Sequence, residues 1–187
     1  MSLTDLLVPT YVQMLRSMAG WLDKACTQLG EPAAEALLTQ RLAPDMYPLA
    51  TQVRFASLQA REAVFRLRAQ ARPVALDDLA QEARECGERP GTMADARARI
   101  DEALAELEAL APDALDAGAA LPIAIELPGL AFDMTGERYA RDWALPQFYF
   151  HVMAAYAILR AQGIALGKAD YVPFMLAYLR PAAAPQG

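Results

Sequence analysis

Three side chains hold most of the chemistry that this sequence can offer, namely His151, Asp45 and Gln52. His151 is the only histidine of the chain, and an imidazole with an ordinary pKa of about 6.5 can bind a ligand or transfer a proton. Asp45 lies in a turn between Pro44 and Pro48, and Gln52 follows one turn into the next helix. We predict that Asp45, Gln52 and His151 line a small-molecule pocket between helices.

Each of these side chains also has a purely structural interpretation. A single histidine on an apolar helix is most often a hydrogen-bonded core residue. Asp45, placed just before a helix, can accept backbone N–H groups and face the positive end of that helix. Gln52 can be a polar residue at the rim of the core. The residues alone leave open whether the protein is an enzyme.

Metal and cofactor chemistry is not indicated by the residue pattern. Zinc sites take three or four side chains, whereas His151 has no second histidine to join it and Ala155 follows at the i+4 position. The glycine-rich phosphate loops GxGxxG and GxxxxGK are absent, and no serine lies in a nucleophile-elbow context. We therefore predict no metal site and no cofactor.

Composition narrows the possible partners. The 187-residue chain has a formal net charge of −6, with its basic residues interleaved among acids, which argues against a nucleic-acid partner. Cys26 and Cys86 are far apart and form no CxxC motif, so we expect reduced thiols. No basic leader and no apolar run of about 20 residues is present. The chain is predicted to be cytoplasmic, with no membrane partner.

The helix that must position His151 is predicted over residues 144–162, ALPQFYFHVMAAYAILRAQ. Pro146 suits its first turn and Gly163 can end it in a left-handed conformation. This helix is apolar on nearly every side. We therefore expect it to be central, with other elements surrounding it.

Apolar residues at steps of three and four predict three further long helices, beginning near Thr4 and Asp5, at about residue 49, and after Thr92. Shorter helices are expected over about 31–41 and 77–86. Alternating residues in 123–127 predict a strand, and after a turn at Pro128-Gly129 the chain is expected to return as a second short strand over 130–134. This β-hairpin must pack on the bundle or pair with another chain, because an isolated hairpin is marginally stable. The predicted fold is all-α, a four-helix bundle with short extra helices and a small hairpin. Residues 1–180 should form one domain and 181–187 a disordered tail.

Two long segments resemble the signatures of a known family. RLAPDMYPLATQV, residues 41–53, and ALPQFYFHVMAAYAILRAQGIALGKADYV, residues 144–172, are similar to those of a bacterial domain-of-unknown-function (DUF) family within the DinB/YfiT-like superfamily. The resemblance extends from about Leu3 to Tyr171. It implies a DinB-like four-helix bundle that is commonly a homodimer.

The wider superfamily includes metalloenzymes and thiol-dependent transferases, whose metal is held by three histidines. One of these lies on the second helix and two lie four residues apart on the last helix. Here His151 matches one of that pair, Ala155 stands at the other position, and Gln52 lies near the second-helix position. We therefore expect an uncharacterised DinB-like dimer with a small-molecule pocket. The alternative is a metal- or thiol-dependent transferase or hydrolase with a degenerate metal site.

Overall fold

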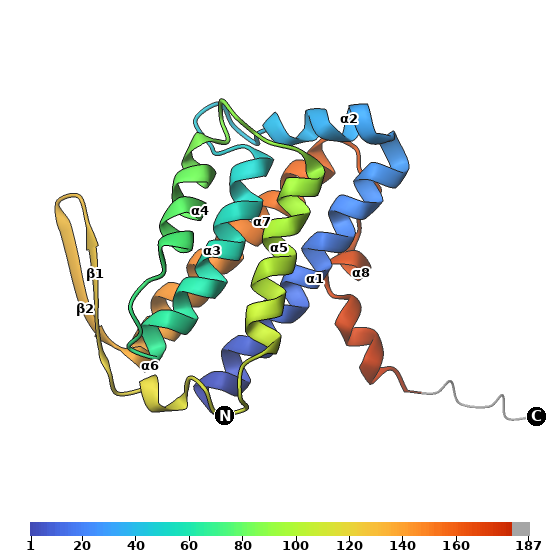
Figure 1. The fold of residues 1–187 in the computed structure, drawn as a ribbon. Helices are drawn as coiled ribbons and strands as arrows, with labels where there is room; N and C mark the ends of the chain where they lie inside the picture. The colour runs from blue at the N-terminus through green and yellow to red at the C-terminus, as the bar shows by residue number, and fades with distance from the viewer. Residues whose placement is uncertain (181–187) are drawn as a thin grey trace, which may run out of the picture.

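Four long helices form the body of the molecule in a computed structural model that describes residues 1–180. The tail predicted to be disordered, residues 181–187, lies outside the described residues. Helix α3 packs against α5 and α7, and α1 packs against the same two helices (Figure 1). The predicted bundle of four long helices is confirmed. The four helices are α1 (Leu3–Leu29), α3 (Leu49–Leu67), α5 (Met93–Glu108) and α7 (Leu145–Ala161).

Shorter elements connect and extend these helices. Helix α4 packs on α3 at one side of the bundle, and the hairpin β1–β2 stands beyond α4 (Figure 1). The remaining short elements lie in the connections and after α7. The bounds are α2 (Glu31–Glu35), η1 (Ala36–Thr39), α4 (Val74–Glu85), η2 (Asp116–Gly118), β1 (Pro122–Leu127), β2 (Leu130–Thr135), α6 (Gly136–Arg138), the π-helical η3 (Tyr139–Ala144), α8 (Lys168–Tyr171) and η4 (Pro173–Tyr178).

The apolar stripes identified in the sequence meet in one core. Their buried members include many alanines, which let the helix backbones approach closely because their side chains are small. At the outer edge of this core, Trp21 of α1 is 1% exposed. Its indole N–H donates to the backbone oxygen of Asp170 at 2.8 Å, and its ring stacks on Tyr171 with centroids 5.6 Å apart. The segment after α7 thus folds back onto α1.

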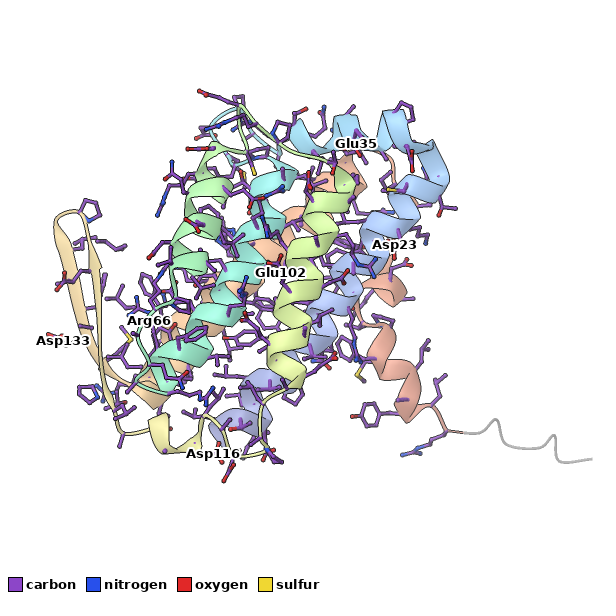
Figure 2. All side chains as sticks on the ribbon, in the orientation of Figure 1. Asp23, Glu35, Arg66, Glu102, Asp116 and Asp133 are labelled. Atoms are coloured by element: carbon purple, nitrogen blue, oxygen red, sulfur yellow. The ribbon has the colours of Figure 1, made fainter. Side chains whose placement is uncertain are left out.

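Side-chain caps fix several helix ends. Ser2, rather than Thr4 or Asp5, caps α1 by accepting from the Asp5 N–H at 3.1 Å. Thr4 instead donates its backbone N–H and its hydroxyl to Asp116 at 2.9 and 2.7 Å. These bonds tie the start of α1 to η2, the element that carries Asp116 in Figure 2. Thr92 caps α5, its hydroxyl oxygen accepting from the Asp95 N–H at 3.0 Å.

The hairpin has one apolar and one polar face. Ile125 lies opposite Phe132 and Leu127 lies opposite Leu130 in the antiparallel register, so these side chains share a face. Ile123 and Ile125 are buried against the bundle, whereas Leu127, Leu130 and Phe132 are 43%, 59% and 39% exposed. The predicted hairpin is confirmed, and the distal half of its apolar face has no cover within residues 1–180.

Helix α7 is not surrounded on every side, contrary to the expectation from its apolar sequence. Phe148 and Val152 are fully buried, but Phe150 is 56% exposed and Met153 is 45% exposed. Neighbouring helices cover the rest of α7, and one apolar face remains open in the part of the chain that the structure describes. Among residues 1–180, no helix combines the length and apolar character needed to cross a membrane.

Candidate functional site

His151 and Gln52 come together between two adjacent helices of the bundle. His151 lies on α7 and Gln52 lies one turn into α3, and their exposed fractions are 7% and 1%. Nδ1 of His151 lies 2.8 Å from Oε1 of Gln52. The two residues that sequence analysis placed in one pocket are therefore hydrogen-bonded neighbours, although they are 99 positions apart in the chain.

A second hydrogen bond fixes the tautomer of His151. The amide nitrogen of Gln52 donates to the backbone oxygen of Tyr47 at 3.1 Å. This bond turns Oε1, which can only accept, toward the imidazole. Nδ1 must therefore be the protonated nitrogen, and Nε2 keeps its lone pair free.

Aromatic rings surround the imidazole. The rings of Phe55 and Phe150 have centroids 5.1 and 5.3 Å from that of His151, and Tyr47 lies 5.5 Å from Phe55. Nε2 of His151 has no hydrogen bond within residues 1–180. In that range, the only fully buried side-chain polar atom without a partner is Oη of Tyr11. Nε2 therefore keeps some contact with solvent at the edge of this aromatic group.

Burial determines the charge of His151. Loss of hydration lowers the pKa of the imidazole from 6.5 to about 4, because an apolar environment disfavours the cation. The ring is thus neutral at pH 7. It offers Nε2 as an uncharged hydrogen-bond acceptor in an aromatic environment.

Asp45 is not brought to the His151–Gln52 pair. It is exposed in the turn before α3, and its carboxylate forms no hydrogen bond or ion pair with the described residues. Helix α3 follows Pro48 without any side-chain cap, so the interpretation of Asp45 as a helix cap is wrong. The Pro-bracketed turn contributes the backbone oxygen of Tyr47 to the site, and a role for Asp45 in binding stays a prediction.

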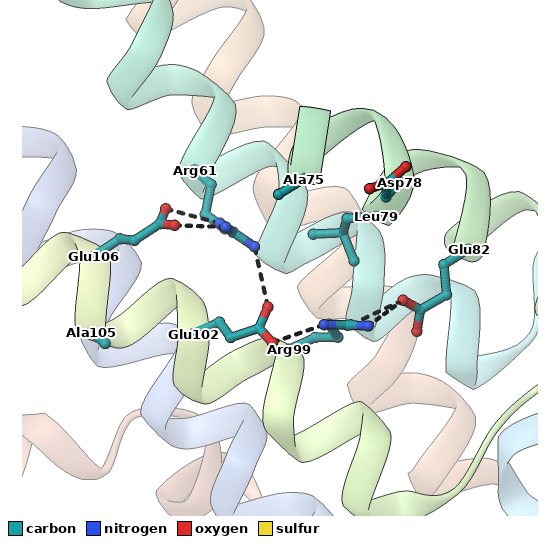
Figure 3. Close-up of a pocket in the computed structure, with 9 residues that line it drawn as sticks. All are labelled: Arg61, Ala75, Asp78, Leu79, Glu82, Arg99, Glu102, Ala105 and Glu106. Carbon is teal, nitrogen blue, oxygen red and sulfur yellow. Dashed lines mark hydrogen bonds and ion pairs between the residues drawn. The ribbon is translucent and has the colours of Figure 1, made fainter. Parts of the chain in front are cut away.

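A second cluster of polar side chains, which sequence analysis did not identify, lines a cavity of about 540 Å³ between α3, α4 and α5 (Figure 3). Arg61 bonds Glu106 at 2.9 and 2.6 Å. Arg99 bonds Glu82 at 2.9 Å and Glu102 at 2.8 Å. These pairs join α5 to both α3 and α4.

Arg54 forms the buried end of this network. It is 1% exposed and bonds Glu82 at 2.5 Å. Burial alone would raise the pKa of Glu82, but hydrogen bonds and charge from Arg54 and Arg99 together lower it, so the carboxylate is ionised at neutral pH. Because Arg54, Arg61 and Arg99 already have carboxylate partners, we interpret the network as a structural link between helices.

A sequence signal for this network does exist. Arg54 and Arg61 are seven residues apart, which places them on the same side of α3. The same helix buries Val53, Ala56 and Ala60. Because arginine is almost never buried without a partner, this spacing indicates that both guanidinium groups are enclosed and paired with carboxylates. The identity of their carboxylate partners requires the packing of three helices.

Comparison with known proteins identifies the family. The family model described as Domain of unknown function (DUF1993) matches residues 3–172. The chain belongs to this family. A solved structure of a DinB family member protein from Shewanella denitrificans is similar, with 32% identity, a TM-score of 0.73, and coverage of 98% of this chain and 96% of that chain. No curated protein gives a significant match.

The residues of this DUF1993 protein do not fit the three-histidine metal site of the wider superfamily. Ala155, four residues after His151, is a buried core residue, and Gln52 uses its oxygen to bind the imidazole. Within residues 1–180, no three side chains of histidine, cysteine, aspartate or glutamate gather in a way that could hold a metal ion. We therefore derive no chemical step through a metal.

Proposed function

We propose that this DUF1993 protein binds a small molecule at the His151–Gln52 pair. The observation that supports the proposal is a neutral imidazole whose Nδ1–H is held by Gln52 at 2.8 Å. Its other nitrogen is free to accept a hydrogen bond in an aromatic environment. A core histidine with a purely structural role would more commonly have both ring nitrogens satisfied.

The surroundings of the pair indicate the chemical class of the ligand. Nε2 requires a ligand N–H or O–H, because it can only accept. Phe55 and Phe150 favour a flat apolar group that packs against their rings. A cavity of about 380 Å³ that includes Tyr47 and Pro48 is lined mainly by charged side chains and by neither His151 nor Gln52, so we place the ligand at the partly exposed aromatic edge beside Nε2.

Binding is favoured over the alternative of a transferase or hydrolase. A general base works best when its pKa lies near the working pH, and burial lowers the pKa of His151 to about 4. Burial also raises the pKa of the Cys26 and Cys86 thiols, so neither cysteine is an activated thiolate at neutral pH. A neutral acceptor that remains unprotonated suits recognition better than proton transfer.

The test uses the fact that His151 is the only histidine. In a ¹⁵N-labelled protein, phenol or indole should shift the Nε2 resonance in a saturable way, and His151→Phe should abolish binding of the same probes. Asp78→Asn, in the separate cavity between α3, α4 and α5, is the matched control and should bind normally. Asp45→Asn measures whether Asp45 contributes. Probes that bind His151→Phe as tightly as the wild type would refute the site.

The proposal also includes the organisation of the protein. Residues 1–180 act as one domain in a cytoplasmic homodimer. The resemblance to DinB-like proteins supports the dimer, and so do the uncovered apolar halves of α7 and of the hairpin.

A further inference from the structure

A continuous apolar surface runs from the hairpin tip along the open side of α7. The ring of Phe132 on the hairpin lies 5.7 Å from that of Trp143, in the helical turn that leads into α7. Phe150 and Met153 continue the surface two and three turns further along the chain. We call the set Leu127, Leu130, Phe132, Trp143, Phe150 and Met153 the α7–hairpin surface.

The composition of the α7–hairpin surface is that of an interface core. Its members are aromatic or aliphatic, with no charge among them, and aromatic residues and methionine are enriched in such cores. Leu127, Leu130, Phe132, Phe150 and Met153 are each between 39% and 59% exposed. Together they present roughly 450 Å² of apolar area, more than half of the about 800 Å² that each partner contributes to a standard interface.

The apolar face of the hairpin extends beyond the bundle. Its basal residues Ile123 and Ile125 are 5% and 4% exposed against the bundle, whereas Leu130 at its tip is 59% exposed on the same face. Exposure of the distal apolar side chains of the hairpin to water is energetically unfavourable, and such exposed patches commonly mark interaction sites. A second body lying against the open side of α7 would cover it.

We infer that the α7–hairpin surface is the homodimer interface, in which α7 packs antiparallel against α7 of a second copy and each hairpin reaches over the other bundle. This inference rests on the homodimer included in the proposed function. A two-fold axis near Phe150 and Met153 would place the most apolar part of the surface at the centre. A self-complementary patch of this kind is what a two-fold dimer requires.

Charges at the two ends of α7 favour a second copy over another partner. Asp142 and Arg160 lie about nine residues on either side of the midpoint between Phe150 and Met153. In an antiparallel pair, Asp142 of one copy therefore faces Arg160 of the other, twice by symmetry. Asp142 now bonds only Arg141, in a pair that is more than half exposed at both side chains. Arg160 bonds the backbone oxygen of Leu166 and has no carboxylate partner within residues 1–180.

Sedimentation velocity of the full chain from 1 to 100 µM tests the inference. We expect the sedimentation coefficient of the wild type to correspond to a dimer, with twice the chain mass of 20.3 kDa. Phe150→Glu should weaken dimerisation at least about 100-fold, because it buries two charges at the axis, and Leu130→Glu should weaken it about tenfold or more. Leu176→Glu is the matched control, since Leu176 is 62% exposed on η4, away from this surface; it should dimerise normally. Circular dichroism of each variant verifies that it is folded.

A charge exchange gives an independent test of the antiparallel arrangement. Asp142→Arg should weaken the dimer about tenfold, and adding Arg160→Asp to it should restore the dimer. If the wild type is monomeric at 100 µM, both the homodimer and this interface are refuted. The same conclusion follows if a monomeric wild type co-sediments with phosphatidylcholine vesicles and the Phe150→Glu variant does not. A dimer that persists in folded Phe150→Glu, or that Leu176→Glu disrupts equally, would leave the homodimer standing and overturn the surface.

Discussion

Acidification should destabilise the protein through His151. The pKa of this residue falls from 6.5 to about 4 on folding, so between these two values the unfolded chain binds more protons than the folded one. The free energy of unfolding therefore decreases as the pH falls from about 6.5 toward 4. Because each pKa unit corresponds to about 1.4 kcal/mol, the full contribution is about 3 kcal/mol, of which about 2 kcal/mol should be lost between pH 7.5 and pH 5.

Urea denaturation of the wild type and of His151→Gln at both pH values measures this contribution. The variant keeps a hydrogen-bonding side chain but cannot gain a proton, and the protein has no other histidine. The wild type should therefore lose about 2 kcal/mol more than the variant. Equal losses in the two proteins, or an NMR titration of His151 with a midpoint near 6.5, would refute the account of a buried neutral imidazole.

The contact with Gln52 can be tested in the same titration. Gln52→Glu places a carboxylate 2.8 Å from Nδ1, and a nearby negative charge favours the imidazolium. The pKa of His151 should rise into or above its ordinary range, and the acid-induced loss of stability should shrink. If the pKa stayed low, the two side chains would not be in contact in solution.

Four further substitutions and one double variant test the packing, each measured by urea denaturation at pH 7.5. Arg54→Met should cost about 3 kcal/mol because Glu82 loses its buried partner, and Glu82→Gln in that background should recover part of the loss. Gly136→Ala should cost about 3 kcal/mol, since the added carbon would lie 1.9 Å from a backbone oxygen; Gly20→Ala, with open space around it, should stabilise α1 by about 0.5–1 kcal/mol. Tyr11→Phe should stabilise by about 1 kcal/mol, because it removes a buried hydroxyl without a partner. The opposite sign in any of these measurements would contradict the corresponding contact.

Most of the fold could be predicted because local rules determine it. Apolar spacing of three and four marks a helix wherever the partner lies, and Gly30 and Gly163 end α1 and α7 with φ of 78° and 80°. Alternation likewise identified β1, and the turn at Pro128-Gly129 indicated that the chain returns as β2. Helix α4 begins at Val74 after Pro73 rather than at Asp77, because a proline can precede the first turn without any side-chain cap.

The site was only partly predictable because it depends on which helix faces meet. Periodicity places Gln52 and His151 on particular faces, but only the packing of α3 against α7 brings their side chains within 2.8 Å. Pairing of Arg54 and Arg61 with carboxylates depends in the same way on three helices. An apolar sequence also cannot distinguish a helix enclosed by its own chain from one with an open face, which is why the exposure of Phe150 was not foreseen.

The bond between Trp21 and the oxygen of Asp170 spans 149 positions of the chain and bears on how the protein is made. Helix α7 and the segment after it leave the ribosome later than α1 and α3, yet they cover apolar faces of both helices. Until they emerge, a nascent chain that already contains most of the protein displays these faces to the surroundings. Closure of the fold is therefore postponed until α7 and the segment after it have been synthesised, and chains interrupted before Leu145 should be held by chaperones or degraded.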